Sequence, residues 1–122
     1  MTTVGVDLVR VSRVAESLAS FGERFLRRVF TDGEIAYATA TPALAAERLA
    51  ARFAAKEAAF KALALADHGS WRDIEVTRAP SGACALALHG AARAAADEAG
   101  VVELAVSLSH EGDYATAVVL VM

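Results

Sequence analysis

The chain has almost no cysteine and no long uninterrupted apolar run. Cys84 is the only cysteine among 122 residues, which excludes an intramolecular disulfide and a thiolate metal cluster. No apolar stretch approaches the length of a membrane-spanning helix, and the first residues lack the charged lead and long apolar core of a secretory signal. We therefore expect a cytoplasmic protein that does not enter a membrane, with Cys84 as a small buried residue of a strand.

Positive and negative side chains nearly balance, so the chain has no large excess of either charge, and its formal net charge is only −3. Such a balance argues against general nucleic-acid binding, but the distribution is uneven. The first 28 residues are rich in arginine, and the part after Arg93 is acidic. The arginines near the start are Arg10, Arg13, Arg24, Arg27 and Arg28. We expect the basic end of the chain to meet an acidic partner.

The length and the 56% hydrophobic content fit one domain over residues 1–122, with a real core. Apolar alternation and turn residues predict strands at 3–9, 84–88, 101–109 and 114–122, and a further strand that Trp71 leads into. Residues 67–70 are expected to form a turn, and residues 110–113 a hairpin connection between the last two strands. Helical spacing and capping residues predict helices at 12–20, 31–39, 43–66 and 91–99. Ser12 is the expected cap of the first, and Thr31 and Glu34 form the capping-box pattern at the start of the second. The pattern indicates an α+β fold, with helices packed on a mostly antiparallel sheet.

The helix predicted over residues 43–66 is the longest in the chain, with Thr41 as its cap and Pro42 at its first position. Lys56 falls inside its apolar stripe, and Glu57 and Lys61 lie one turn apart beside that stripe. A purely structural explanation makes Glu57 and Lys61 a surface ion pair, while the Lys56 amine reaches out to solvent. The stripe itself consists of Leu49, Phe53, Phe60 and Leu63.

Two carboxylates stand in apolar surroundings far apart in the sequence, Asp7 in the first strand and Glu57 in the long helix. Gly5 lies on the same strand face as Asp7, where it leaves room for a ligand or marks a bulge. A carboxylate pair suits a hard divalent ion that takes further oxygens from water and phosphate. Lys56, Lys61 and His110 would then supply positive or donor groups for the same phosphates. No Walker loop or dinucleotide glycine fingerprint is present, so side chains and a metal would have to hold any phosphate.

Four stretches, in order, resemble the motifs of holo-acyl-carrier-protein synthase, the small class of 4′-phosphopantetheinyl transferases. They are Gly5-Val6-Asp7, Arg13, the run from Arg52 to Ala62 (RFAAKEAAFKA), and Ser107-Leu108-Ser109-His110. The resemblance spans nearly the whole chain. It implies the phosphopantetheinyl transferase fold, and transfer of the 4′-phosphopantetheine arm of coenzyme A to a serine of an acidic acyl carrier protein, with Mg²⁺ and release of 3′,5′-ADP.

The resemblance also assigns roles by position. Asp7 and Glu57 match metal-binding carboxylates, Lys61 and His110 match residues around the coenzyme A phosphates, and Arg52, Phe53 and Lys56 match a coenzyme-binding run. Arg13, Arg24 and Arg28 fall where the family presents a basic helix to the carrier protein. The base that takes the serine proton is either Glu57 or a metal-held water that Glu57 activates. A homotrimer with sites between subunits is expected.

Two segments depart from the family pattern. Many relatives have a glycine-rich loop after the central helix, whereas here residues 62–68 are expected to extend the helix and the next glycine is Gly69. The usual Gly-Lys-Pro turn is replaced by Gly82-Ala83-Cys84. These departures suggest a specialised relative, serving a polyketide or other secondary-metabolite carrier.

Two other classes of function compete with the enzyme. One is a non-catalytic trimeric module that binds the carrier protein or coenzyme A, and the retention of both Asp7 and Glu57 argues against it. The other is an alanine-rich structural oligomer, for which every motif match would be accidental.

Overall fold

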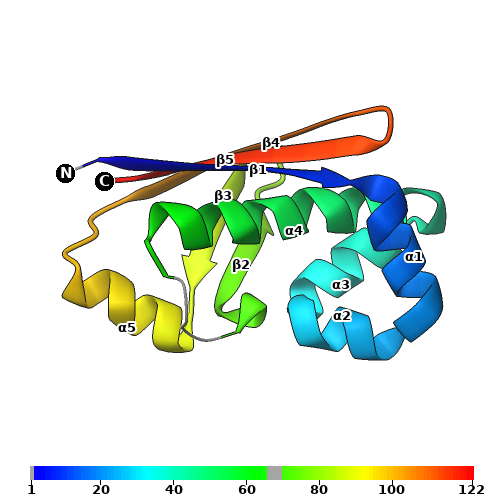
Figure 1. The fold of residues 1–122 in the computed structure, drawn as a ribbon, viewed down its shortest axis with the longest axis horizontal. Helices are drawn as coiled ribbons and strands as arrows, with labels where there is room; N and C mark the ends of the chain where they lie inside the picture. Colours follow the sequence, from blue (N-terminus) through cyan, green and yellow to red (C-terminus); the bar gives the residue numbers. More distant parts are fainter. Residues whose placement is uncertain (1, 66–69) are drawn as a thin grey trace.

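One helix, α4 (Ala45–Ala62), runs through the middle of the molecule and organises the other elements around it (Figure 1). The computed structural model describes residues 2–65 and 70–122. Eleven of the 18 residues of α4 are buried, so the helix is covered on several sides rather than along one stripe. Alanine at most of these positions lets strands and helices approach closely, which explains the alanine content.

A three-stranded antiparallel sheet lies along one side of α4, in the strand order β1-β5-β4 (Figure 1). Its strands are β1 (Thr3–Arg10), β4 (Leu104–Glu111) and β5 (Tyr114–Val121). The face toward α4 carries small or branched residues, and Ala115, Ala117 and Val119 on it are fully buried. The opposite face is exposed although apolar, with Val4, Val6 and Leu8 each more than half accessible.

A separate two-stranded antiparallel sheet, β2 (Ile74–Arg78) and β3 (Cys84–Leu88), packs elsewhere on α4. A 3-10 turn, η2 (Trp71–Asp73), leads into β2, and α5 (Gly90–Glu98) follows β3. The predicted antiparallel pairing is confirmed, but it is divided between two sheets.

Three short helices, α1 (Val11–Phe21), α2 (Glu23–Val29) and α3 (Asp32–Thr39), gather near the N-terminal end of α4 (Figure 1). The predicted capping box of α3 is present, since Thr31 and Glu34 satisfy each other's backbone amides. The predicted Ser12 cap of α1 is wrong. The helix begins at Val11, and the carboxylate of Asp113 accepts hydrogen bonds from the Ser12 amide at 2.9 Å and from its hydroxyl at 2.7 Å.

The predicted extension of the central helix beyond Ala62 is also wrong for the described residues. The helix also begins later than predicted, at Ala45, because Pro42–Leu44 form a 3-10 turn. At the other end, Ala64 has a φ of 55°, and the Leu65 amide donates to the Phe60 carbonyl at 2.9 Å. This bonding is a Schellman stop. The rest of the predicted extension and most of the predicted turn, residues 66–69, lie outside the described residues.

Gly5 has a packing role rather than the ligand-related one expected from the sequence. A Cβ at this position would lie 2.0 Å from the carbonyl oxygen of Ala58, so only glycine lets β1 cross α4 at this distance. Within the described part of the chain, no helix is long and apolar enough to cross a membrane.

Candidate active site

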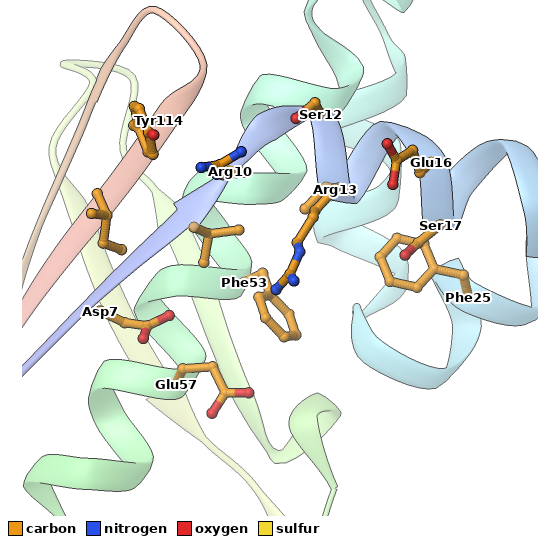
Figure 2. A pocket seen from close by; sticks show the side chains of 13 residues that line it. Asp7, Arg10, Ser12, Arg13, Glu16, Ser17, Phe25, Phe53, Glu57 and Tyr114 are labelled. Carbon is orange, nitrogen blue, oxygen red and sulfur yellow. The ribbon is translucent and has the colours of Figure 1, made fainter.

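The close crossing of β1 and α4 brings the two predicted carboxylates to one cavity. Asp7 follows Gly5 by two residues, so its side chain lies on the face of β1 that meets α4. Glu57 precedes Ala58 on α4. Both line a cavity of about 930 Å³ between the end of β1, the start of α1 and the middle of α4, and Figure 2 shows the two carboxylates near one another.

The remaining wall of the cavity mixes basic, acidic and aromatic side chains. Arg13 from α1 reaches into it in the direction of Phe53 (Figure 2). Besides Asp7, Glu57, Arg13 and Phe53, the side chains labelled there are Arg10, Ser12, Glu16, Ser17, Phe25 and Tyr114. An open cavity lined by carboxylates and arginines can accept a ligand that carries both phosphate and polar groups.

Lys61 lies beside this cavity and is paired with Asp7 rather than with Glu57. Its Nζ donates to Asp7 Oδ1 and to the Val6 carbonyl, each at 3.0 Å. The side chain is 57% exposed, so the ammonium can turn toward a ligand at small cost. The alternative in which Glu57 serves only as the helical partner of Lys61 is therefore not the arrangement of this structure.

Glu57 instead accepts a hydrogen bond from Trp71, at 3.2 Å between Nε1 and Oε1. The indole also lies against Phe53, with 6.0 Å between the ring centroids. Sequence analysis gave Trp71 no role beyond leading into a strand. Its only signal was that it is the sole tryptophan of the chain, and nothing local predicts a contact with a residue of α4.

Lys56 is not at the cavity, because its side chain is fully buried. Its Nζ pairs with Glu34 Oε1 at 2.7 Å, and donates to the Trp71 carbonyl at 3.1 Å and to the Ile74 carbonyl. Burial lowers the pKa of Lys56, and the charge of Glu34 opposes this shift. All three ammonium donors are used, so the expected coenzyme contact is corrected to a structural role, and the amine does not reach solvent.

Arg52 is also directed away from the cavity. Its guanidinium carbon lies 4.4 Å from the ring centroid of Tyr37, and those of Arg48 and Arg78 lie 4.5 Å and 5.3 Å from the same centroid. Burial lowers the pKa of Arg52. Of the predicted coenzyme-binding run, Phe53 alone lines the cavity.

His110 stands on β4, and β5 separates it from β1. It is not among the residues that line the cavity, and its Nδ1 pairs with Glu47 Oε1 of α4. The predicted hairpin connection is shorter than expected, because Glu111 ends β4 and only Gly112 and Asp113 form the turn. His110 is therefore a strand residue with a half-exposed side chain.

The basic residues expected to meet a carrier protein divide into two groups. Arg13 on α1 lines the cavity, whereas Arg24 and Arg28 are exposed on α2. Arg27, between them, is paired with Glu23 at 3.0 Å. The exposed cations thus lie on the two helices that follow the cavity-lining end of β1.

Known proteins resemble this chain over almost its whole length. The family model of the 4′-phosphopantetheinyl transferase superfamily matches residues 3–119. The holo-[acyl-carrier-protein] synthase of Moorella thermoacetica is 48% identical over 122 residues, covering 99% of this chain and 94% of the relative. That of Koribacter versatilis is 45% identical over 118 residues, covering 95% and 94%.

Solved structures agree with the sequence relatives. The ACPS–CoA complex of Chronobacterium ammoniagenes superimposes with a TM-score of 0.88 at 39% identity, covering 100% of this chain and 97% of that one. The Helicobacter pylori holo-[acyl-carrier-protein] synthase in complex with coenzyme A gives 0.84 at 30% identity, covering 98% and 99%. The chain has the fold of these proteins and belongs to the 4′-phosphopantetheinyl transferase superfamily.

Proposed function

We propose that this protein transfers the 4′-phosphopantetheine arm of coenzyme A to a serine of an apo acyl carrier protein, in a Mg²⁺-dependent reaction that releases 3′,5′-ADP. The observation that carries the proposal is the convergence of Asp7 and Glu57 on one cavity beside Lys61. Relatives named holo-[acyl-carrier-protein] synthase, and neighbours whose structures contain coenzyme A, support the choice of substrates.

The carboxylate pair fits a magnesium ion better than a metal held by protein ligands alone. Across residues 2–65 and 70–122, no group of three or more His, Cys, Asp or Glu side chains could hold a metal ion. Mg²⁺ commonly binds through one or two carboxylates and fills its other positions with water and substrate phosphate. Asp7 and Glu57 would hold the ion, which when bound neutralises charge on the pyrophosphate.

The transfer forms one bond and breaks one. The serine oxygen of the carrier attacks the phosphorus that bears the pantetheine arm, and the bond from this phosphorus to the bridging oxygen breaks. The electron pair leaves with 3′,5′-ADP. Glu57 takes the serine proton, directly or through a water molecule, because it is the carboxylate of the cavity that is not paired with Lys61. Lys61 turns from Asp7 toward the phosphates and stabilises their charge.

We further propose that the active protein is a homotrimer with its sites between subunits. The outer face of the three-stranded sheet supports this, since Val4 is 63%, Val6 57%, Leu8 64% and Val118 42% exposed. Such a contiguous apolar face is normally covered by a partner. In this assembly His110 and Arg52, which lie off their own subunit's cavity, would contact coenzyme A at a subunit boundary. Light scattering of the active species should give three times the chain mass, and a fully active monomer would refute the assembly.

The acidic carrier protein is proposed to dock on α1 and α2 through Arg13, Arg24 and Arg28. The two helices follow the end of β1 at the cavity, so a carrier bound there would present its serine to Asp7 and Glu57.

Incubation of an apo acyl carrier protein with coenzyme A, Mg²⁺ and this protein, followed by mass spectrometry of the carrier, tests the activity. We expect the mass of the carrier to rise by one phosphopantetheine arm, and no change when Mg²⁺ is replaced by a chelator. An unchanged carrier that nevertheless binds to the protein would identify the non-catalytic binding module instead.

A further inference from the structure

Trp71 does not line the cavity itself, but its side chain is hydrogen-bonded to Glu57, which does. Its Nε1 donates to Glu57 Oε1 at 3.2 Å, and it belongs to η2, the turn that precedes β2. An indole N–H is a donor only, so this contact is made with a carboxylate oxygen that accepts. The bond leaves the second oxygen of Glu57 free of the indole.

The backbone of the Trp71 turn is anchored to the residue that precedes Glu57. The buried Lys56 donates to the Trp71 carbonyl at 3.1 Å, and the same amine is paired with Glu34. The next residue, Arg72, donates to the Arg27 carbonyl of α2 at 2.8 Å. The turn is thus fixed on both sides, and a fully buried ion pair sets its distance from α4.

The ring of Trp71 is fixed as well, because it leans on Phe53 at an interplanar angle of 38°. Phe53 and Glu57 are one helical turn apart on α4 and both line the cavity. The Trp71 side chain therefore contacts two residues of the cavity wall on α4, Phe53 through its ring and Glu57 through its N–H group.

We propose that Trp71 is the positioning residue for Glu57. The terminal torsion of a glutamate is broad and poorly defined by itself. With Oε1 bonded to a fixed indole, the carboxylate plane is set and the other oxygen is directed to the cation. Partners that orient metal ligands in this way typically affect metal affinity or activity by about 10–100-fold. The inference rests on the proposed function for the identity of the cation, but the hydrogen bond itself can be tested without activity.

The first experiment observes the hydrogen bond in solution by NMR. Because the chain has one tryptophan, a ¹⁵N-labelled sample gives one indole N–H signal, without assignment work. We expect Glu57→Ala to move this signal to the position of a free indole and to speed its exchange with water. Glu47→Ala, a second glutamate change on α4, should leave it in place. A signal that is identical in the wild type and Glu57→Ala would overturn the proposal.

The second experiment measures metal binding. Trp71→Phe keeps an aromatic ring against Phe53 and removes the N–H donor, together with part of the indole ring system. We expect about 10–100-fold weaker binding of Mn²⁺, followed by its electron paramagnetic resonance signal in the presence of coenzyme A, and a matching rise in the Mg²⁺ concentration for half-maximal transfer. Excess Mg²⁺ should restore most of kcat.

Ser70→Ala is the matched control, because Ser70 caps the same turn through a 3.1 Å bond from the Arg72 amide and does not contact Glu57. It should weaken the turn without changing the metal requirement. Equal metal requirements in Trp71→Phe and the wild type, or equal losses in Trp71→Phe and Ser70→Ala, would reduce Trp71 to a packing residue. If the wild type transfers nothing, the proposed function fails, while the NMR and Mn²⁺ measurements still decide the positioning role.

Discussion

Gly5 of β1 and Ala58 of α4 are in such close contact that a Cβ on Gly5 would lie 2.0 Å from the Ala58 carbonyl oxygen and 3.0 Å from its carbonyl carbon. The obstacle is helix backbone, which cannot move aside as a flexible side chain can. The crossing point lies two residues before Asp7 and one residue after Glu57, so a methyl group at Gly5 would push apart the two elements that carry these carboxylates.

Gly5→Ala should therefore damage both stability and the site. We expect a loss of about 3 kcal/mol or more in the free energy of unfolding, because β1 must move away from α4. Gly22→Ala is the control, since it adds a Cβ with nothing within 4 Å at a φ of 51° and a ψ of −126°, and its cost should be about 1–3 kcal/mol from backbone strain alone. Urea denaturation of both variants measures the difference, and equal losses would mean that the crossing is not tight.

The stop of α4 at Ala64 offers a stabilising change. Ala64 holds a φ of 55° in a Schellman turn, and a residue with a Cβ is strained there. Ala64→Gly should raise the free energy of unfolding by about 0.5–1 kcal/mol. The reciprocal control is Gly100→Ala at the end of α5, where Gly100 has a φ of 76°, and it should destabilise. A fall in thermal midpoint for Ala64→Gly would contradict the turn assignment.

The buried pair Lys56–Glu34 yields a prediction about coupled substitutions. Lys56→Met leaves the Glu34 carboxylate buried without its cation, which typically costs about 3–5 kcal/mol. Glu34→Gln combined with Lys56→Met removes both charges and should recover part of that loss. Denaturation of the two single variants and the double variant gives the coupling energy. Additive losses would show that the two side chains do not depend on each other.

How far the sequence predicted the structure depends on how local each interaction is. The capping box of Thr31 and Glu34 follows from residues three positions apart, and it was predicted correctly. The cap of α1 comes from Asp113, 101 positions away from Ser12, and no pattern near Ser12 could indicate it. A tertiary contact with Asp113 therefore caps α1 in place of the local candidate, Ser12.

The same distinction applies to the site. Asp7 and Glu57 could be selected because each is a carboxylate in an apolar pattern, and their order matches a family motif. Lys56 was recognised as out of place in its stripe, but its partner depends on how α3 and β2 pack on α4. The end of α4 was missed because alanine and leucine favour helix. The left-handed conformation of Ala64 costs free energy, and only the packing around it, which the local sequence does not show, can offset that cost.

Carrier recognition should be largely electrostatic, because Arg24 and Arg28 are exposed on α2 and Arg13 lies at the cavity. Arg24→Glu is the sharper test, since Arg13→Glu changes the cavity wall as well. We expect Arg24→Glu to raise KM for the carrier several-fold more than KM for coenzyme A, and added salt to weaken carrier binding by the wild type. Arg93→Glu on α5 is the control, and equal effects on both substrates would contradict the docking surface.

The carboxylate pair gives the strongest prediction about catalysis. Glu57→Gln retains the size of the side chain and its ability to accept the bond from Trp71, but it removes the charge for the ion and the basicity for the serine proton. We expect kcat to fall by about 10²–10⁴-fold, the range of a lost general base, while coenzyme A still binds. Asp7→Ala should abolish transfer at ordinary Mg²⁺ and leave the circular dichroism spectrum unchanged, because Asp7 lines the cavity rather than the core.

Glu98→Gln, an exposed carboxylate of α5, serves as the control for the loss of one negative charge and should retain full activity. The decisive comparison is the Mg²⁺ dependence of transfer in Glu57→Gln. If Glu57 only makes surface contacts, which typically contribute about 0.2–1 kcal/mol, this variant would transfer the arm at a near-normal rate with the Mg²⁺ requirement of the wild type. That result would remove Glu57 from the metal site, and with it the reason to place the reaction in the cavity between β1 and α4.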